Sequence, residues 1–142
     1  MENTLYKTVA INEGGASGEV RVKNTNIALE LSPLNESLVT NPDATNPEQL
    51  FAMGYAASYT RTLQEIAVGK EINIEDFSVA AEVKVIEDEE AFIDWEVNLD
   101  VYIPNVTLEV GENLLNETYE ACPYSAMIEG NMEVTLNLLL DE

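Results

Sequence analysis

Alternating hydrophobic and polar positions predict three strands in the N-terminal part of the chain. Residues 5–11 (LYKTVAI) and 18–22 (GEVRV) flank the turn-rich segment NEGGAS. This arrangement predicts a β-hairpin in which Gly14 and Gly15 adopt positive φ. Residues 26–31 (NIALEL) also alternate, which predicts a third strand with one buried face.

A long helix follows a predicted loop at residues 32–45, which is polar and contains two prolines. Asn46 is a suitable N-cap, Pro47 suits the first helical position, and Gln49 completes a pattern similar to a capping box. The helix is expected to end near Gly69. Its first turns (FAMGYAAS) are apolar or small on most sides, so the helix requires a packing partner, and a second copy of the chain could supply it.

The C-terminal part predicts a second hairpin, a helix and a last strand. Residues 77–86 (FSVAAEVKVI) and 92–103 (FIDWEVNLDVYI) alternate with period two and are joined by an acidic turn. Residues 107–121 predict a helix that ends at Cys122-Pro123, because proline disfavours helical geometry in the preceding residue. Residues 131–140 predict the final strand. The element order is βββ-α-ββ-α-β, an α+β fold.

Composition is consistent with one globular domain. The 142 residues fit a single domain over 1–142, and 46% of them are hydrophobic, which is sufficient for a core. Lys and Arg number 6 and Asp and Glu 27, for a formal net charge of −21. Such a chain repels phosphate backbones and anionic lipids, so we expect no nucleic acid or membrane partner. The charge serves solubility, or adapts the surface to a salty cytoplasm.

Cysteine and histidine usage limits the chemistry. Cys122 is the single cysteine and histidine is absent, so no intrachain disulfide is expected and a structural zinc site is excluded. A hard-cation site built from carboxylates stays open, but no cofactor is indicated. The sequence has no apolar run of about 18 residues and begins without signal-peptide features, so we expect a cytoplasmic protein.

Two segments carry a resemblance to a known family. TNPEQLFAMGYAASY (45–59) and CPYSAMIEGNMEVTL (122–136) resemble the signature stretches of the organic hydroperoxide resistance (Ohr) branch of the Ohr/OsmC family. The opening LYKTVAINEGG resembles that family's first strand and turn, so the likeness covers nearly the whole chain. It implies an intertwined homodimer with antiparallel sheets around two central helices, and two active sites at the subunit interface.

The resemblance also implies a thiol peroxidase mechanism and an oxidative stress response. In that family, one cysteine attacks an organic hydroperoxide and becomes a sulfenic acid. A second cysteine condenses with it to a disulfide, which lipoylated proteins or other dithiols reduce. An arginine and a glutamate hold the thiolate and orient the peroxide.

Carried over by position, the family's catalytic set is incomplete in this chain. The attacking cysteine corresponds to Ser58, the resolving cysteine to Cys122, the glutamate to Glu48 and the arginine to Ala16. A serine hydroxyl ionises far less readily than a thiol and has no sulfenic acid state, and no histidine is present to act as its base. The family mechanism therefore cannot proceed as written.

Several alternatives stay open at these positions. Arg21 or Arg61 could reach the site from another direction. Cys122 could be oxidised alone, with an external thiol as resolving group, or it could be a buried, inert thiol at a helix C-terminus. Ser58 could be a small packing residue that bonds to the carbonyl four residues back, and the helix dipole alone could favour Glu48.

Glu48 and Ser58 are 10 residues apart on one predicted helix, or roughly 15 Å along its axis. If both line one site, Glu48 comes from the partner subunit. A set of aromatic and Met residues flanks the equivalent of the peroxide pocket. Most are expected in the core, and any surviving pocket would be an apolar slot: Phe51, Met53, Tyr55, Tyr59, Tyr124 and Met127.

Three functions remain possible. The first is an Ohr/OsmC protein with lost, reduced or redirected peroxidase activity carried by Cys122 with Glu48. The second is a non-catalytic dimeric protein that binds an apolar or lipid-like molecule in the former active-site pocket. The third is a structural or interaction role through the acidic surface.

Overall fold

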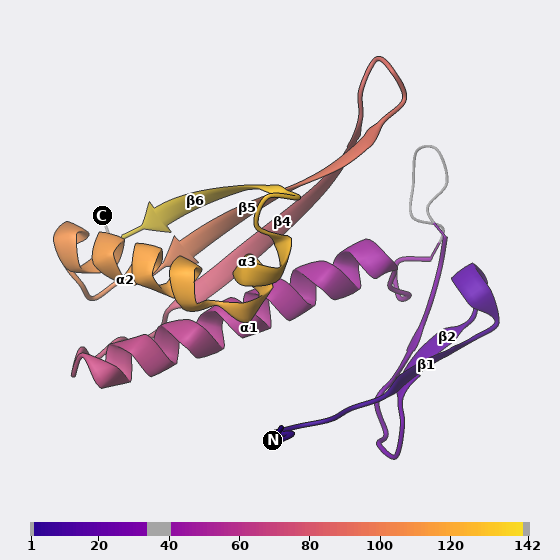
Figure 1. Cartoon of the computed structure of the whole chain (residues 1–142), viewed down its shortest axis with the longest axis horizontal. Helices are drawn as coiled ribbons and strands as arrows, with labels where there is room; N and C mark the ends of the chain where they lie inside the picture. The colour runs from indigo at the N-terminus through magenta and orange to yellow at the C-terminus, as the bar shows by residue number, and fades with distance from the viewer. Residues whose placement is uncertain (1, 34–40, 141–142) are drawn as a thin grey trace. The chain divides into compact units, whose positions relative to one another are not determined.

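The computed structural model describes residues 2–33 and 41–140. Two compact units make up the chain, an N-terminal unit Met1–Leu50 and a C-terminal unit Phe51–Glu142. Figure 1 shows the elements of each unit. The expectation of a single domain over the whole chain stays a prediction.

The N-terminal unit contains a three-stranded antiparallel sheet in the order β1-β2-β3. Gly14 (φ 85°) caps the 3-10 turn η1 and Gly15 (φ 68°) is its first residue, and these values confirm their predicted positive φ. The first strand was predicted over 5–11 but covers Ala10–Glu13, because its ladder with the second strand runs from Ala10 opposite Val22 to Glu13 opposite Glu19. The strand and turn bounds are β1 Ala10–Glu13, η1 Gly15–Ser17, β2 Glu19–Val22 and β3 Ala28–Glu30.

The chain returns to β3 just before the long helix α1 (Pro47–Gly69) begins. Thr45 N–H donates to Glu30 O (2.8 Å), and Ser32 N–H donates to Thr45 O (3.0 Å). Asn46 Oδ1 then accepts from Gln49 N–H (2.8 Å), which confirms the predicted N-cap. The helix ends at Gly69 as predicted. Part of the predicted loop, 34–40, lies outside the described residues.

The sheet of the C-terminal unit has the order β4-β5-β6. β4 (Ser78–Glu87) and β5 (Ile93–Tyr102) form the predicted antiparallel hairpin. β6 (Glu133–Leu139) pairs with β5 in parallel, so this sheet is mixed rather than fully antiparallel. The parallel pairing follows from the crossover through two helices between β5 and β6.

The crossover contains one helix that the sequence pattern missed. α2 (Leu108–Ala121) ends before Cys122 as predicted, and Thr107 Oγ1 caps its start by accepting from Val110 N–H (3.3 Å). Pro123 then begins a short helix, α3 (Pro123–Ile128). Proline excludes its predecessor from a helix but is well suited to the first position of the next one.

The helices of the C-terminal unit cover one face of its sheet (Figure 1). Alternate residues of β5 point to that face and are almost fully buried. They pack in one core cluster with residues of α1 and α2, which fixes the helices that carry the site. The central members of the cluster are Val97, Leu99, Val101, Tyr55, Tyr59, Leu63, Leu114 and Leu115.

Candidate functional site

Ser58 and Cys122 face each other inside the C-terminal unit. Ser58 lies in the middle of α1 and is 8% exposed, while Cys122 lies between α2 and α3 and is fully buried. Ser58 Oγ is 3.6 Å from Cys122 Sγ, within hydrogen-bonding range for sulfur. The fold thus brings together two positions that are 64 residues apart and that the resemblance assigns to the family's pair of cysteines.

Local geometry explains why the two side chains meet. Cys122 N–H closes α2 by donating to Thr118 O (2.8 Å), and the extended backbone at Cys122 turns the chain into α3. On α1 the Ser58 hydroxyl meets the thiol, whereas Thr62 Oγ1 donates to Ser58 O (3.0 Å). Thr62 therefore bonds to a carbonyl four residues back, and the same kind of bond from Ser58 itself stays a prediction.

Two tyrosine hydroxyls connect α1 to the helices on either side of Cys122. Tyr59 Oη donates to Leu115 O of α2 (2.7 Å). Tyr55 Oη hydrogen-bonds to Ser125 Oγ of α3 (2.6 Å). Both tyrosines are fully buried, and together the two bonds fix the position of the cysteine between them.

The electrostatic surroundings of the pair are neutral. Burial raises the pKa of Tyr55 to about 12, an effect that the hydrogen bond from Ser125 opposes and that Cys122 and Tyr119 reinforce. Burial also raises the pKa of Tyr59, with further contributions from Cys122 and Tyr55. Both phenols are therefore protonated at neutral pH, and neither can act as a base toward the serine.

Aromatic rings extend from this pair toward β5. Phe51 contacts Tyr55 (ring centroids 5.9 Å apart) and Tyr124 (6.2 Å). It also meets Trp95 edge to face at 5.8 Å. Trp95 was missed by sequence reasoning, although it shares the alternation of β5 with the buried Val97. A cavity of about 340 Å³ begins beyond this cluster and is lined by Phe51, Ile93, Asp94, Trp95, Asn131 and Met132.

The six predicted pocket residues divide into two groups. Tyr55 and Tyr59 are core residues and fill the space around the serine, and Phe51 and Tyr124 pack on them. Met53 and Met127, however, are 53% and 64% exposed, so the expectation that these residues mostly lie in the core is wrong for them. Both belong to helix faces that are directed away from the core of the unit.

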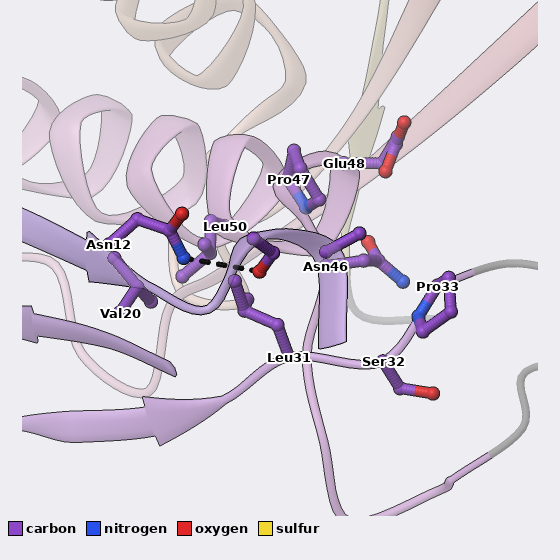
Figure 2. Close-up of a pocket in the computed structure, with 11 residues that line it drawn as sticks. Asn12, Val20, Leu31, Ser32, Pro33, Asn46, Pro47, Glu48 and Leu50 are labelled. Carbon is purple, nitrogen blue, oxygen red and sulfur yellow. Dashed lines mark hydrogen bonds between the residues drawn. The ribbon is translucent and has the colours of Figure 1, made fainter. Parts of the chain in front are cut away.

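Ala16 and Glu48 line a second cavity, which lies within the N-terminal unit (Figure 2). Its volume is about 560 Å³. Ala16 belongs to η1 and Glu48 to the first turn of α1, where the helix dipole favours a negative charge. The lining also includes residues that the sequence did not indicate, because strand register and chain return bring them together: Asn12, Gly15, Val20, Leu31, Ser32, Pro33, Asn46, Pro47 and Leu50.

Neither arginine proposed as a substitute lines this cavity. Arg21 Nη2 pairs with Glu13 Oε1 at 3.1 Å across the β1-β2 ladder, and the two side chains are 39% and 66% exposed. Arg61 is exposed on α1. The described lining of the Ala16 cavity contains no lysine or arginine.

The described part of the chain has no group of three or more Cys, Asp or Glu side chains placed to hold a metal ion. Within the same residues no helix combines the length and hydropathy needed to cross a membrane.

Comparisons with known proteins agree with the resemblance. Residues 40–137 match the family model "OsmC-like protein". The organic hydroperoxide resistance protein OhrA of Bacillus subtilis is 34% identical over 143 residues, covering 97% of this chain and 99% of that protein. "Organic hydroperoxide resistance protein-like 1" of Staphylococcus saprophyticus is 33% identical over 135 residues, with 94% of each chain covered.

A solved structure shows the same fold. The crystal structure of an organic hydroperoxide resistance protein OsmC from Legionella pneumophila matches with a TM-score of 0.88 and 34% identity. The match covers 96% of this chain and 99% of that one. With an α+β fold of this type and a family match over most of its length, the chain belongs to the Ohr/OsmC family of OsmC-like proteins.

Proposed function

We propose that this protein is a member of the organic hydroperoxide resistance and oxidative stress response group whose thiol peroxidase activity is lost or much reduced. The observation that carries the proposal is the 3.6 Å approach of Ser58 Oγ to Cys122 Sγ. This close approach supports a site of the two-cysteine type in which Ser58 takes the position of the attacking cysteine.

The chemistry of the first step explains the loss. A thiolate attacks the distal oxygen of ROOH, the O–O bond breaks, and an alcohol leaves after it takes up a proton. The sulfur is oxidised to sulfenic acid and the peroxide is reduced. A serine oxygen has no corresponding oxidation state, and its hydroxyl is not ionised at neutral pH. Ala16 at the arginine position also removes the cation that would stabilise a thiolate, so restoring sulfur alone would give a weakly activated nucleophile.

Cys122 alone is a poor substitute for the missing pair. An external thiol would have to resolve its sulfenic acid, and the Cys122 side chain is fully buried. Oxidation follows thiolate character and solvent access. The burial therefore favours an inert thiol over redirected activity carried by Cys122 with Glu48.

The proposed assembly is a homodimer in the cytoplasm. Glu48 lies in the first turn of α1 and Ser58 follows 10 positions later, roughly 15 Å along the axis. A carboxylate that served the same small molecule as Ser58 would come from a second copy. Any remaining turnover would use an organic hydroperoxide as oxidant and a lipoylated protein or other dithiol as reductant.

Reversal of the two substitutions tests the proposal. Ser58→Cys should give weak dithiol-dependent consumption of cumene hydroperoxide. Ser58→Cys combined with Ala16→Arg should give at least tenfold more, because a cation increases the thiolate fraction. The matched control is Ser58→Cys with Ala16→Gln, which adds length without charge. If neither cysteine-bearing variant consumes peroxide above the buffer blank, the assignment of these positions is wrong.

A second candidate function is supported by the cavity at Ala16. A cavity of about 560 Å³ has the size of a small-molecule site, and most of its lining is apolar. The alternative is therefore a non-catalytic dimer that binds an elongated apolar molecule. Native mass spectrometry with decanol tests it, and an absence of bound decanol at saturating concentration would contradict it.

A further inference from the structure

The described lining of the cavity in the N-terminal unit carries negative side-chain charge and no positive charge. Among the described residues that line it, only Glu48 has an ionisable side chain. The sequence supplies no lysine or arginine between Lys7 and Arg21, or between Lys23 and Arg61, and these two stretches contain all the described lining residues. The chain as a whole carries a formal charge of −21. The formal side-chain charge of the described lining is therefore negative.

The two asparagines of the lining already make hydrogen bonds within the chain. Asn12 Nδ2 donates to Gly15 O (3.2 Å) and to Glu19 O (3.0 Å). Asn46 Oδ1 accepts from Gln49 N–H (2.8 Å). In contrast, the described residues provide no cationic partner for the half-buried Glu48 carboxylate. Glu48 is thus the group that can select a ligand by charge.

The lining is also arranged from apolar to charged. Val20, Leu31 and Leu50 provide aliphatic surface, and Ala16 leaves the space beside them open. Figure 2 shows Glu48 on the first turn of α1, on the opposite side of the view from Asn12 and Val20. A molecule with an apolar body and a cationic head matches both features, because its body is buried while its head stays near the carboxylate.

We propose that this cavity binds amphiphilic amines, molecules with an aliphatic body and a protonated amino group that pairs with Glu48. The inference rests on the second candidate function, ligand binding without catalysis, and it specifies the ligand class. Anionic amphiphiles such as fatty carboxylates are disfavoured by the same charge, and neutral ones are bound through the apolar lining alone.

Equilibrium dialysis of the intact protein with three decyl probes tests the proposal. Below their micellar concentrations, decylammonium should bind at least threefold more tightly than decanol, and decanoate should bind more weakly than either. The preference for decylammonium should shrink as NaCl is raised, because the carboxylate is partly exposed to solvent.

Three variants distinguish binding in the cavity from binding to the acidic surface of the protein. Glu48→Gln should remove the preference for the ammonium probe while decanol still binds. Glu30→Gln, which removes an exposed carboxylate of β3 outside the lining, should leave the preference intact. Ala16→Arg should invert it in favour of decanoate. Circular dichroism of each variant verifies that it is folded.

The outcomes are distinct. Equal affinity for decylammonium and decanol would overturn the charge selectivity and leave apolar binding in place. A preference that survives Glu48→Gln would assign the ammonium probe to the outer acidic surface and overturn the proposal. Failure of all three probes to bind would remove the binding function itself.

Discussion

Ser58 Oγ and Cys122 Sγ lie 3.6 Å apart, so a cysteine at position 58 would hold its sulfur close to that of Cys122. The pair is buried, and the tyrosine hydroxyls around it are neutral because burial raises their pKa. At the level of single residues, the proposed loss of activity therefore depends on one atom, because a serine oxygen has no sulfenic acid state.

Ser58→Cys should form an intrachain disulfide with Cys122 when treated with a mild oxidant. Mass spectrometry without a reducing agent would detect the disulfide, and neither thiol would then react with a thiol-specific reagent. Thr60→Cys is the matched control, because the Thr60 hydroxyl bonds to Ala56 O and Ala57 O on its own helix. A Thr60→Cys chain should keep two reducible thiols. Two free thiols in oxidised Ser58→Cys would contradict the observed geometry.

The buried tyrosines predict a loss of stability at high pH. An unfolded tyrosine ionises near pH 10, whereas the folded-state pKa of Tyr55 is about 12. Ionisation is thus easier in the unfolded chain, so the contribution to stability is complete below about pH 10 and is lost as the pH rises toward 12. Denaturation followed by circular dichroism from pH 9 to 12 should show this decline. It should be shallower in Tyr55→Phe, and an unchanged slope would contradict the assigned cause.

At the scale of elements, α1 organises the site because it contacts both helices that flank Cys122. Tyr59 bonds to α2 and Tyr55 bonds to α3. The two short hydrogen bonds fix the turn at Cys122-Pro123 from both sides.

Removing one of these links should cost stability. Tyr59→Phe deletes the bond from Tyr59 Oη to Leu115 O while it keeps the buried ring. We expect the free energy of unfolding to fall by about 1 kcal/mol, the usual net contribution of such a bond. Urea denaturation measures it, with Tyr6→Phe as control because Tyr6 is 82% exposed. Equal midpoints for the two variants would show that the link does not stabilise the fold.

Most elements could be predicted from sequence because their signals are local. The cap at Asn46, the positive φ at Gly14 and Gly15, and the alternation along β5 each depend on neighbouring residues. Nothing local distinguishes the parallel pairing of β6, which depends on the crossover.

The short helix α3 does not follow from the sequence pattern for a related reason: Pro123 both ends the preceding helix and begins the next one. Gly111 is buried in α2, and a Cβ there would lie 2.8 Å from Leu138 Cδ2. Its function is therefore close packing between the helix and β6.

The candidate site was only partly predictable. Ser58 and Cys122 face each other, in agreement with the pair of positions that the resemblance indicates. The cavity around Ala16 and Glu48 could not be derived, because its lining comes from separated segments that the register of β1 to β3 brings together. The exposure of Met53 and Met127 also depends on packing that no sequence period encodes.

At the scale of the whole molecule, the single chain leaves much apolar surface open. Leu5, Tyr6, Phe92 and Met127 are each more than half exposed. The N-terminal sheet has only three short strands and few buried residues, so it requires a cover to be stable. A second copy of the chain would provide that cover.

Light scattering should therefore give twice the chain mass of 15.7 kDa. Because each subunit carries a formal charge of −21, mutual repulsion should weaken the dimer at low salt. Dilution experiments should show dissociation at a higher protein concentration in low salt than at physiological ionic strength. A monomer under both conditions would exclude a site in which the partner supplies Glu48.

Steady-state turnover of the unmodified protein is the most direct test of the central claim, that oxygen at position 58 abolishes or strongly reduces peroxidase activity. Cumene hydroperoxide and dihydrolipoamide should be consumed at or near the rate of a buffer blank, and Cys122→Ser should change nothing. OhrA of Bacillus subtilis, assayed in parallel, provides the family reference. Consumption by the wild-type protein at a rate comparable to that reference would contradict the account.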